Sequence, residues 1–326
     1  MSVSVQASRI KLTVMVCTWN RSQYLDTALA EMRKLKIPDG LEWELLVVNN
    51  NSTDNTDEII ARHSSALPLR RLFEKRPGKS IAANYGISQA RGDLIVCTDD
   101  DVLVDPDWVS EYVGAAKRWP DAAYFGGTID PYFESDPPQW IRNYLVKNGP
   151  YSVLQHGIAV RPMGRDELGP IGANMAIRMS VLREFSFDTR LGPIKEEILP
   201  ADDGEFFFRL KKAGYKGVWV GTAKVRHRIA ADLLTSKYVW NWYREHGRTE
   251  VRRGVTRGLK TSFGVPRWIL RKYLSAQLTS LLLSPIKGES WVRAYTNAAR
   301  TSGMMQEYRL IAHSEIKGQE TQSPPA

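Results

Sequence analysis

The fold is decided by one stretch, Asp93–Asp101 (DLIVCTDDD), in which a short apolar run leads directly into three consecutive carboxylates. The apolar part has the length of a buried strand, and such strands occur mainly in parallel sheets. Three adjacent carboxylates repel one another, and partial burial raises their pKa unless a cation neutralises them. Mg²⁺ and Mn²⁺ prefer oxygen ligands such as carboxylates, so the triplet is a candidate site for one of these ions. A solvated turn or helix cap is the alternative, and it becomes the minority interpretation when the strand ends at the ligand-binding edge of a sheet.

The first hundred residues alternate between strand-like and helical patterns around this stretch. Helical spacing begins near Tyr24 and stops before Pro38, resumes after Asp54, and recurs over Gly78–Ala90. The expected strands are Lys11–Cys17, Glu44–Val48, Arg70–Phe73 and Asp93–Cys97. This alternation predicts an α/β fold with a mostly parallel sheet. Polar clusters at 18–21, 49–54 and 98–101 follow three of the strands, so we expect one site at the carboxyl edge of the sheet.

The pattern changes after Trp108. We expect loop-rich, aromatic segments at Trp119–Thr128, Tyr132–Tyr144 and Gly169–Ala176, then a helix over 203–212 and a strand over Val218–Val220. From Ser236 onward the sequence is helical, aromatic and basic.

A second acidic group, Asp202-Asp203-Gly204-Glu205, stands at a predicted helix start. As a capping box, Asp202 would cap the helix and Glu205 would reach back to it. That interpretation leaves Asp203 without a structural task. A carboxylate in the first turn of a helix is stabilised as the anion by the helix dipole, and a general base must be ionised before it accepts a proton. Asp203 is therefore the candidate general base.

Several motifs together resemble family 2 glycosyltransferases, which have the GT-A fold. They are Cys17–Arg21, Val47–Asp54, Gly78–Gly92, Thr98–Val102, Gly172–Arg178 and Asp202–Phe206. Each motif alone is weak, whereas their order and spacing over about residues 10–230 are specific. The Gly172–Arg178 segment resembles the part of the family that lies under the donor sugar.

The resemblance implies a Rossmann-like, mostly parallel mixed sheet flanked by helices, with a C-terminal helical extension. The implied reaction moves a sugar from a nucleotide-diphosphate sugar, in the first place a UDP-sugar, to an acceptor hydroxyl with inversion. The acceptor would be a glycan or a lipid-linked glycan, in polysaccharide or glycoconjugate synthesis. One displacement needs one base and no enzyme nucleophile. The implied domains are 8–230 (8–105 for the nucleotide, 106–230 for the acceptor), a basic extension at 231–316 and a disordered tail at 317–326.

The resemblance also implies roles for single residues around the donor. The backbone of Cys17 and Thr18 and the ring of Trp19 would hold the base, and Asn49 stands where the family commonly has an Asp that accepts from the uracil ring. Lys79 or Arg76 would approach the diphosphate. Further donor-binding positions carried over from the motifs are Arg21, Asn51, Asn84, Asp99 and Asp100.

For the metal, the resemblance implies a Mn²⁺ or Mg²⁺ ion held by Asp101 and Asp99. A His at the position of His227 helps to bind metal or diphosphate in parts of the family, and a surface His among arginines is an equally weighted interpretation. Arg226 and Arg228 flank it and favour the neutral imidazole that a ligand needs. A divalent ion neutralises charge on the leaving nucleoside diphosphate as the glycosidic bond breaks.

Two other classes of protein are weighed against this one. A nucleotidyltransferase that makes nucleotide sugars would carry a Gly-rich loop with Arg after the first strand, whereas Thr18–Arg21 has no Gly. A non-catalytic nucleotide-binding protein has no reason to keep both the Asp99–Asp101 triplet and Asp203.

Composition and charge exclude several other classes of protein. With 326 residues, 43% of them hydrophobic, the chain can bury a large core, which excludes a wholly disordered protein. Cys17 and Cys97 cannot build a disulfide scaffold and suit a reducing compartment. The start lacks a signal-peptide layout and no apolar run is long enough to span a bilayer, so we expect a cytoplasmic protein, peripheral at the inner face of the membrane as a second expectation.

Basic and acidic residues are distributed unevenly along the chain. Residues 1–206 hold 23 Lys and Arg against 29 Asp and Glu, whereas residues 207–326 hold 22 against 7. Within the basic part, Val265–Leu283 places Leu270, Leu274, Leu278 and Leu281 on one helical stripe beside Arg267, Arg271 and Lys272. An ordinary packed helix is favoured, an interfacial helix on an anionic membrane surface comes second, and nucleic acid is last because no binding motif accompanies the charge.

Overall fold

A computed structural model describes residues 11–146, 149–194, 197–199, 202–252, 254, 261–262 and 264–320. The predicted domain start at residue 8 and the last part of the predicted tail, 321–326, lie outside them. The strands are β1 (Leu12–Thr18), β2 (Trp43–Asn49), β3 (Leu69–Phe73), β4 (Leu94–Asp99), β5 (Val102–Val104), β6 (Tyr124–Phe133), β7 (Val160–Pro162), β8 (Met175–Arg178), β9 (Gly192–Ile194), β10 (Glu197–Leu199), β11 (Gly217–Ile229), β12 (Thr261–Ser262) and β13 (Val265–Pro266). The helices are α1 (Ser22–Met32), α2 (Thr56–His63), α3 (Lys79–Gln89), α4 (Trp108–Arg118), α5 (Gln139–Tyr144), α6 (Met179–Leu182), α7 (Asp202–Lys212), a 3₁₀ turn (Ala231–Leu233), α8 (Ser236–Arg252), α9 (Arg267–Leu283) and α10 (Glu289–Glu320).

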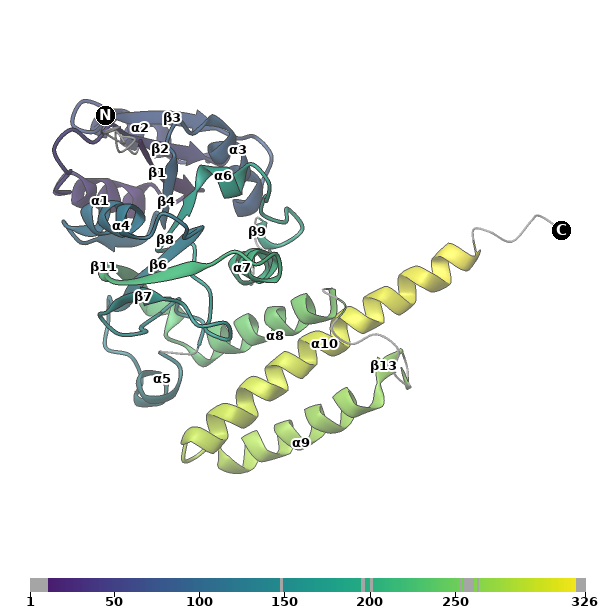
Figure 1. Cartoon of the computed structure of the whole chain (residues 1–326). Coiled ribbons are helices and arrows are strands. Elements are labelled where there is room, and N and C mark those ends of the chain that lie inside the picture. The colour runs from purple at the N-terminus through teal and green to yellow at the C-terminus, as the bar shows by residue number, and fades with distance from the viewer. Residues whose placement is uncertain are drawn as a thin grey trace. The chain divides into compact units, whose positions relative to one another are not determined.

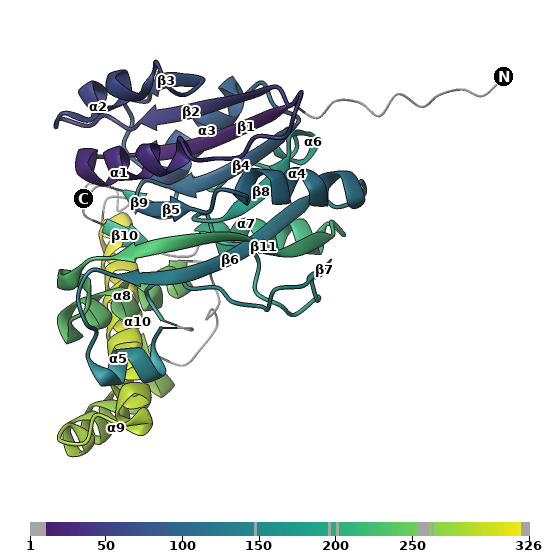
Figure 2. The ribbon, with the colours of Figure 1, turned by 90° about the vertical axis from the view of Figure 1, so that its left-hand side faces the viewer.

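The main sheet has nine strands, and its first half is parallel as the sequence predicts. The strand order is β3-β2-β1-β4-β8-β6-β11-β5, and β7 pairs with β11. β1 pairs in parallel with β2 and with β4, and β2 pairs in parallel with β3, whereas β8 is antiparallel to β4. Figure 2 shows β2, β1 and β4 side by side. The predicted α/β fold with a mixed sheet flanked by helices is confirmed.

Helices cover both faces of the parallel strands, which explains why these strands are apolar throughout. On β1, Val14 and Val16 join a core with Leu25 and Leu29 of α1, whereas Met15 joins the opposite core. That opposite core also contains apolar side chains of α3, α6 and α7. Figure 1 shows α1 and α4 on one side of the sheet and α3, α6 and α7 on the other. A strand buried on both faces needs no polar alternation.

The segment after Trp108 is more regular than its sequence predicts. Residues expected to be loop-rich form most of the ten-residue β6, the helix α5 and the start of β8. Glycines obscure the strand pattern of β6, because Gly126 and Gly127 give no apolar signal. At Gly127 an added Cβ would lie 2.2 Å from the carbonyl oxygen of Ala223 on β11, so the close approach of the two strands requires glycine there. The predicted strand at Val218–Val220 is part of the longer β11.

The chain divides into two compact units. The first comprises residues 1–132, 151–195 and 202–228, and the second 133–150, 196–201 and 229–326. The second unit is helical, and in Figure 1 α10 runs between α8 and α9. No helix among the described residues is both long and apolar enough to cross a bilayer.

Two glycines let α8 and α10 approach closely. A Cβ at Gly247 of α8 would lie 1.9 Å from the carbonyl oxygen of Arg300, and a Cβ at Gly303 of α10 would lie 1.8 Å from that of Arg244. Neither backbone leaves room for a side chain at these points. The two helices are therefore packed backbone to backbone.

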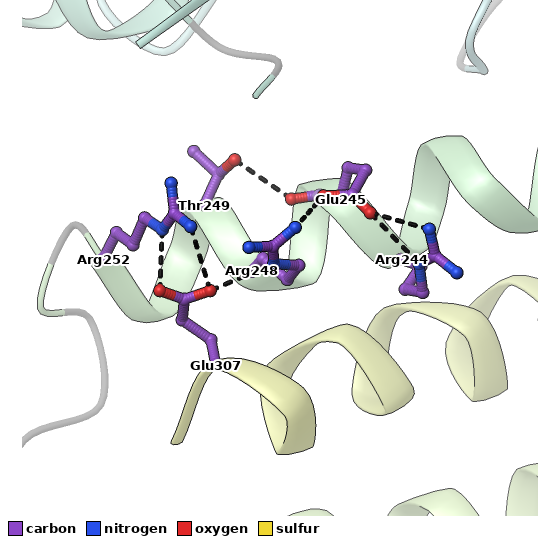
Figure 3. Close-up of polar contacts among 6 residues, drawn as sticks. All are labelled: Arg244, Glu245, Arg248, Thr249, Arg252 and Glu307. Carbon is purple, nitrogen blue, oxygen red and sulfur yellow. Dashed lines mark hydrogen bonds and ion pairs between the residues drawn. The ribbon is translucent and has the colours of Figure 1, made fainter. Parts of the chain in front are cut away.

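An ion network joins the same two helices (Figure 3). Glu307 of α10 accepts from Arg248 Nε at 3.0 Å and from Arg252 Nε at 2.7 Å, so each of its carboxylate oxygens has a guanidinium partner. Arg248 also donates to Glu245 at 2.8 Å. Burial raises the pKa of Glu307, but its bonds to Arg252 and Arg248 outweigh burial and lower it below the ordinary value. We call Glu245, Arg248, Arg252 and Glu307 the α8–α10 cluster.

Candidate active site

Three polar segments meet at the carboxyl edge of the parallel strands. The register pairs Thr18 of β1 with Asn49 of β2, and Cys17 of β1 with Asp99 of β4. The ends of these strands therefore lie side by side, as expected from the polar clusters that follow them. The backbone N–H of Asn50 donates to the carbonyl oxygen of Thr18 at 2.9 Å and continues the pairing beyond the strands.

Arg21 and Thr18 bind the second carboxylate of the triplet. Asp100 is buried and accepts from Thr18 Oγ1 at 2.7 Å and from Arg21 NH1 at 3.2 Å. The same Arg21 nitrogen donates to Asp101 Oδ2 at 2.7 Å. One guanidinium from the β1–α1 connection thus bridges two adjacent carboxylates.

Lys79 binds the first carboxylate. Its Nζ lies 2.6 Å from Asp99 Oδ1, and Lys79 is the first residue of α3. Of the two cations that the resemblance offers for the diphosphate, the structure brings Lys79 to the triplet. Arg76 instead forms a two-pronged ion pair with Glu74, with nitrogen-to-oxygen distances of 2.9 and 2.7 Å.

Asn50 positions the segment that carries Lys79, and sequence reasoning did not single it out. Its amide nitrogen donates to the carbonyl oxygens of Glu74 and Arg76 at 3.0 and 2.6 Å, and its amide oxygen accepts from Gly78 N–H at 2.9 Å. Gly78 has φ 133°, a region that favours glycine. A polar residue directly after a strand that is buried and fully hydrogen-bonded is a positioning residue, and burial is the signal that the sequence does not carry.

His227 faces the third carboxylate from β11. Its Nε2 lies 3.4 Å from Asp101 Oδ1, and the strand register places His227 opposite Val102 of β5. Burial lowers the pKa of His227, but the Asp101 carboxylate outweighs it and raises the pKa above its ordinary value. The arginines on either side, Arg226 and Arg228, therefore do not offset the effect of Asp101, and a neutral His227 stays a prediction for the site with a cation bound. These arginines alternate with His227 along the strand and lie over the rings of Tyr132 and Tyr24, at 5.6 and 4.8 Å.

The surroundings shift the pKa values of Asp100 and Asp101 in opposite directions. Burial and the neighbouring Asp101 raise the pKa of Asp100, and Arg21 offsets this only in part. Burial also acts to raise the pKa of Asp101, but His227, Arg21 and Lys79 outweigh it and lower that pKa well below the ordinary range. Asp101 is thus the ionised member of the pair, and Asp100 is the member that takes up a proton first.

The donor atoms at Asp101 fit a divalent cation. Asp101 Oδ1 is buried with no hydrogen-bond partner among the described residues, and His227 Nε2 faces it at 3.4 Å. The described residues contain no group of three or more His, Cys, Asp or Glu side chains arranged to hold a metal. Mg²⁺ and related ions need only one or two carboxylates when substrate phosphates and water complete the shell, and an imidazole suits Mn²⁺ better than Mg²⁺. The residues fit an ion that arrives with a phosphate ligand.

Asp203 lies on a cavity that Asp99 also lines. The cavity has a volume of about 30 Å³, and its lining includes Cys17, Lys79, Asp99, Gly172 and Asp203. Asp203 Oδ2 accepts from Gly172 N–H at 2.8 Å, and a Cβ at residue 172 would lie 3.1 Å from that oxygen. Glu205, the other member of the predicted capping box, instead accepts from Arg209 at 2.7 Å, and the Asp202 side chain lies outside the described residues.

The two cysteines border the same cavity. Burial raises the pKa of the Cys17 thiol to about 12 and that of Cys97 above its ordinary value as well. Both remain thiols at neutral pH, and a thiol is a poor nucleophile compared with a thiolate. This agrees with a reaction that uses no enzyme nucleophile.

The remaining residues predicted to bind the donor differ in burial and in partners. Asn49 is buried, donates to Asp57 Oδ1 at 2.7 Å and accepts from Ser52 N–H at 2.8 Å. Asn84 makes two hydrogen bonds of 2.9 Å with the backbone of Phe187 and lines a different cavity, of about 400 Å³. Trp19 and Asn51 are exposed at the same sheet edge. Contacts of these residues with a donor remain predictions.

Comparison with known proteins gives a family and relatives. The family described as Glycosyl transferase family 2 matches residues 13–186, which is more than half of the chain. The glucosyl-dolichyl phosphate glucuronosyltransferase of Haloferax volcanii is 23% identical over 254 residues, covering 72% of this chain and 76% of the relative. The chain spans between 22% and 51% of the length of three further curated relatives.

Two solved structures share the fold. The mannosyltransferase PcManGT from Pyrobaculum calidifontis, in complex with GDP-Man and Mn²⁺, is 18% identical with a TM-score of 0.53 over 95% of this chain and 76% of that one. TarS 1–349 of S. aureus, in complex with UDP-GlcNAc, is 16% identical with a TM-score of 0.52 over 95% and 92%. At such identities the similarity shows the fold alone, and the family match carries the assignment. The chain belongs to glycosyl transferase family 2, and the protein is a glycosyltransferase with the GT-A fold.

Proposed function

We propose that this enzyme moves a sugar from a nucleotide-diphosphate donor, in the first place a UDP-sugar, to an acceptor hydroxyl with inversion at the anomeric carbon. The observation that carries the proposal is the cavity lined by both Asp99 and Asp203. These residues come from chain segments about a hundred positions apart, one at the end of β4 and one in the first turn of α7. A base and a carboxylate that faces the diphosphate must converge in this way for a single displacement.

Asp203 is the proposed general base. The hydrogen bond from Gly172 N–H orients its carboxylate, and a hydrogen bond to the charged form favours that form. The base takes the proton of the acceptor hydroxyl as the oxygen attacks the anomeric carbon, and the nucleoside diphosphate leaves from the opposite face. General-base catalysis of this kind contributes about 10²–10⁴-fold to a rate.

The second requirement is that the negative charge on the leaving diphosphate be neutralised. Lys79 and Arg21 are the cations at the sheet edge, and both hold carboxylates of the triplet. Asp101, Asp99 and His227 would hold a divalent ion, which would neutralise charge on the diphosphate oxygens. Lys79 and Arg21 would contact the diphosphate directly, whereas the carboxylates would act on it only through the bound ion.

The donor and acceptor are proposed from the relatives. TarS was solved with UDP-GlcNAc, and the Haloferax relative is named for a glucosyl-dolichyl phosphate acceptor. We accordingly propose a glycan or lipid-linked glycan as the acceptor of this enzyme. Residues 8–105 would hold the nucleotide and residues 106–230 the acceptor. PcManGT carries GDP-Man, so guanosine donors belong in the first screen.

The donor class is tested by thermal unfolding of the whole protein with Mn²⁺ present. UDP-glucose, UDP-N-acetylglucosamine, UDP-glucuronic acid and GDP-mannose are compared with UDP and GDP alone. We expect a UDP-sugar to raise Tm the most, because a ligand that binds only the folded state stabilises it by mass action. Stabilisation by GDP-mannose alone would reject the uridine assignment, and no shift with any nucleotide sugar would reject the proposed donor site.

The base is tested with Asp203→Asn, and the exposed Asp166→Asn is the matched control. The donor identified by the screen is used, and release of its nucleoside diphosphate is followed. We expect Asp203→Asn to lower kcat by about 10²–10⁴-fold and to leave the Kd of the donor within about twofold. Equal loss of donor binding and turnover would mean that Asp203 is not the base.

A further inference from the structure

Helix α9 presents leucines to solvent rather than to the protein. Leu274, Leu278, Leu281 and Leu282 have between 60% and 72% of their surface exposed, and Ile286, directly after the helix, has 75%. We call these four leucines the α9 leucine stripe. Single exposed leucines are ordinary on a protein surface, whereas several on one face of a helix mark an interaction site.

The opposite face of α9 is the one that packs. Ile269, Ala276 and Ser280 are its buried residues, and Ile269 belongs to a small core with Met304 of α10. Two of these three side chains are small, so α9 lies close to its neighbour with its larger leucines turned away. Of the four leucines on the predicted stripe, Leu270 packs against this core, whereas Leu274, Leu278 and Leu281 are exposed.

The segment of sequence that contains α9 carries charge of one sign. Residues 251–288 contain eight Lys and Arg and no Asp or Glu. Arg267 and Arg271 are exposed and precede Leu274 by seven and three residues, so they share the exposed face of the helix. Trp268, with 39% of its surface exposed, adds an amphipathic ring beside them. The first two turns of the face are basic and the last three are apolar.

We propose that α9 binds an anionic membrane surface through this face. Exposed leucines gain free energy by entering the boundary between headgroups and acyl chains, and Arg and Lys are attracted by anionic headgroups. In this arrangement the leucine stripe and Ile286 enter the boundary, while Arg267 and Arg271 remain at the level of the phosphates. Long basic side chains extend their charge toward water in this way.

A second copy of the chain fits this face less well. The segment 251–288 has no carboxylate with which a second α9 could pair its cations, so two such segments would repel each other. A membrane rich in anionic lipid supplies the missing negative charge and accepts leucine at the same time. The inference does not rest on the proposed reaction, because it concerns a surface that binds vesicles whether or not a sugar is transferred.

The test is sedimentation of the whole protein with vesicles. Pure phosphatidylcholine vesicles are compared with mixed phosphatidylcholine–phosphatidylglycerol vesicles, without donor or acceptor. We expect binding to the mixed vesicles only, and we expect that binding to weaken as salt is raised, because added ions screen the charges. Absence of binding to the mixed vesicles at low salt would overturn the proposal.

Two pairs of variants separate the leucines from the charge. Leu274→Gln/Leu282→Gln removes half of the stripe, and Ile158→Gln/Leu168→Gln is the control, since both of its residues are 67% exposed in the first unit. We expect at least about a tenfold lower partition coefficient for the stripe variant and no change for the control. Arg267→Gln/Arg271→Gln should lower binding about 10–30-fold, whereas Lys117→Gln/Arg118→Gln, with the same loss of charge, should not.

If a second copy of the chain, rather than a membrane, binds the α9 leucine stripe, the experiments will give different results. If the stripe mediates self-association, sedimentation equilibrium without vesicles will show a dimer that Leu274→Gln/Leu282→Gln dissociates, and this would overturn the membrane assignment. Equal binding by the stripe variant and the original protein would overturn it as well. Circular dichroism of each variant establishes that the helices are intact before binding is compared.

Discussion

The molecule contains two clusters of buried charge that differ in their balance. The α8–α10 cluster surrounds Glu307 with two guanidinium groups, and each of its carboxylate oxygens has a partner. At the sheet edge, three adjacent carboxylates meet two basic side chains, Arg21 and Lys79. There the pKa of Asp100 is raised, by burial and by the charge of Asp101, whereas in the α8–α10 cluster the pKa of Glu307 is lowered.

This difference separates a structural cluster from a functional one. A carboxylate whose pKa is lowered stabilises the folded state at neutral pH, whereas one whose pKa is raised opposes folding there. At the sheet edge, one oxygen of Asp101 is left without a hydrogen-bond partner among the described residues. Such a site can accept a further cation, which the α8–α10 cluster has no need to do.

The largest effect should come from Asp101→Asn. Removing this charge from the sheet edge should lower kcat by about 10²–10³-fold, comparable to the loss of one group that stabilises transition-state charge. Activity is measured by release of nucleoside diphosphate over a range of Mn²⁺ concentrations. If the variant keeps full activity in the presence of a chelator, the sheet edge is not a cation site and the contrast between the clusters loses its functional meaning.

Glu307→Gln should act on stability instead. Removing one partner of a buried ion network leaves guanidinium groups without compensation, and we expect a loss of about 3 kcal/mol in the free energy of unfolding. Denaturant unfolding measures this loss, and Arg293→Gln, which breaks an exposed ion pair with Glu289, is the control with an expected change below about 0.5 kcal/mol. Turnover per folded molecule should stay unchanged.

The effect of Glu307→Gln on stability should depend on pH. Because the folded-state pKa of Glu307 is lowered, its contribution to stability is complete above its ordinary value of 4.5 and is lost as the pH falls through the folded-state value. The original protein should therefore lose more stability between neutral and acidic pH than Glu307→Gln. Parallel pH profiles of the two proteins would show that this carboxylate is not stabilised as the anion.

Gly303→Ala should have an intermediate effect. Its Cβ would meet the carbonyl oxygen of Arg244 at 1.8 Å, so α8 and α10 must separate, at a cost of about 1–3 kcal/mol. Gly114→Ala on α4 is the control, because a Cβ there meets nothing within 4 Å. That control should gain about 0.5–1 kcal/mol from helix propensity, and Tm values of both variants measure the difference. A neutral Gly303→Ala would contradict the backbone contact.

Asp100→Asn should have the smallest effect on stability, and any effect should be a gain rather than a loss. Since the folded-state pKa of Asp100 is raised, the folded protein loses stability as the pH rises from the ordinary value of 3.8 toward neutral. An amide cannot ionise and can still accept from Thr18. We expect Tm at about pH 8 to be unchanged or higher by the equivalent of about 1 kcal/mol, with the gain shrinking at about pH 5. A lower Tm at both pH values would show that Arg21 favours the anion more than burial opposes it.

The parallel half of the sheet was predictable because its strands carry their own signal. Apolar runs such as Asp93–Cys97 end in polar clusters, and the rule that ligands bind at the carboxyl edge brings those clusters together. β6 was missed because Gly126 and Gly127 give no apolar pattern, and only the neighbouring β11 explains why they are glycines. Patterns along the chain do not report distances between strands.

The candidate site was predictable in its residue types and less so in its contacts. The sequence offered both Lys79 and Arg76, and the structure brings Lys79 to Asp99 because Glu74 binds Arg76. Arg226 and Arg228 suggested a neutral His227, whereas alternation along β11 turns them away from it and leaves Asp101 as its partner. The leucines of α9 had the period of a packed stripe, but the period alone does not say which way a stripe faces.

The amides at the sheet edge have a consequence for redesign. Asn49 and Asn50 each hold a loop or a backbone segment in place, so substituting either of them would disturb the shape of the sheet edge before it altered which donor that edge prefers. Trp19 and Asn51 carry no such anchoring among the described residues and are exposed. Under the proposed function, a library that randomises Trp19 would explore new specificities on this framework, whereas Asn51 has φ 63°, which few side chains other than Asn and Asp adopt easily. Relatives with other preferences should therefore differ first at Trp19.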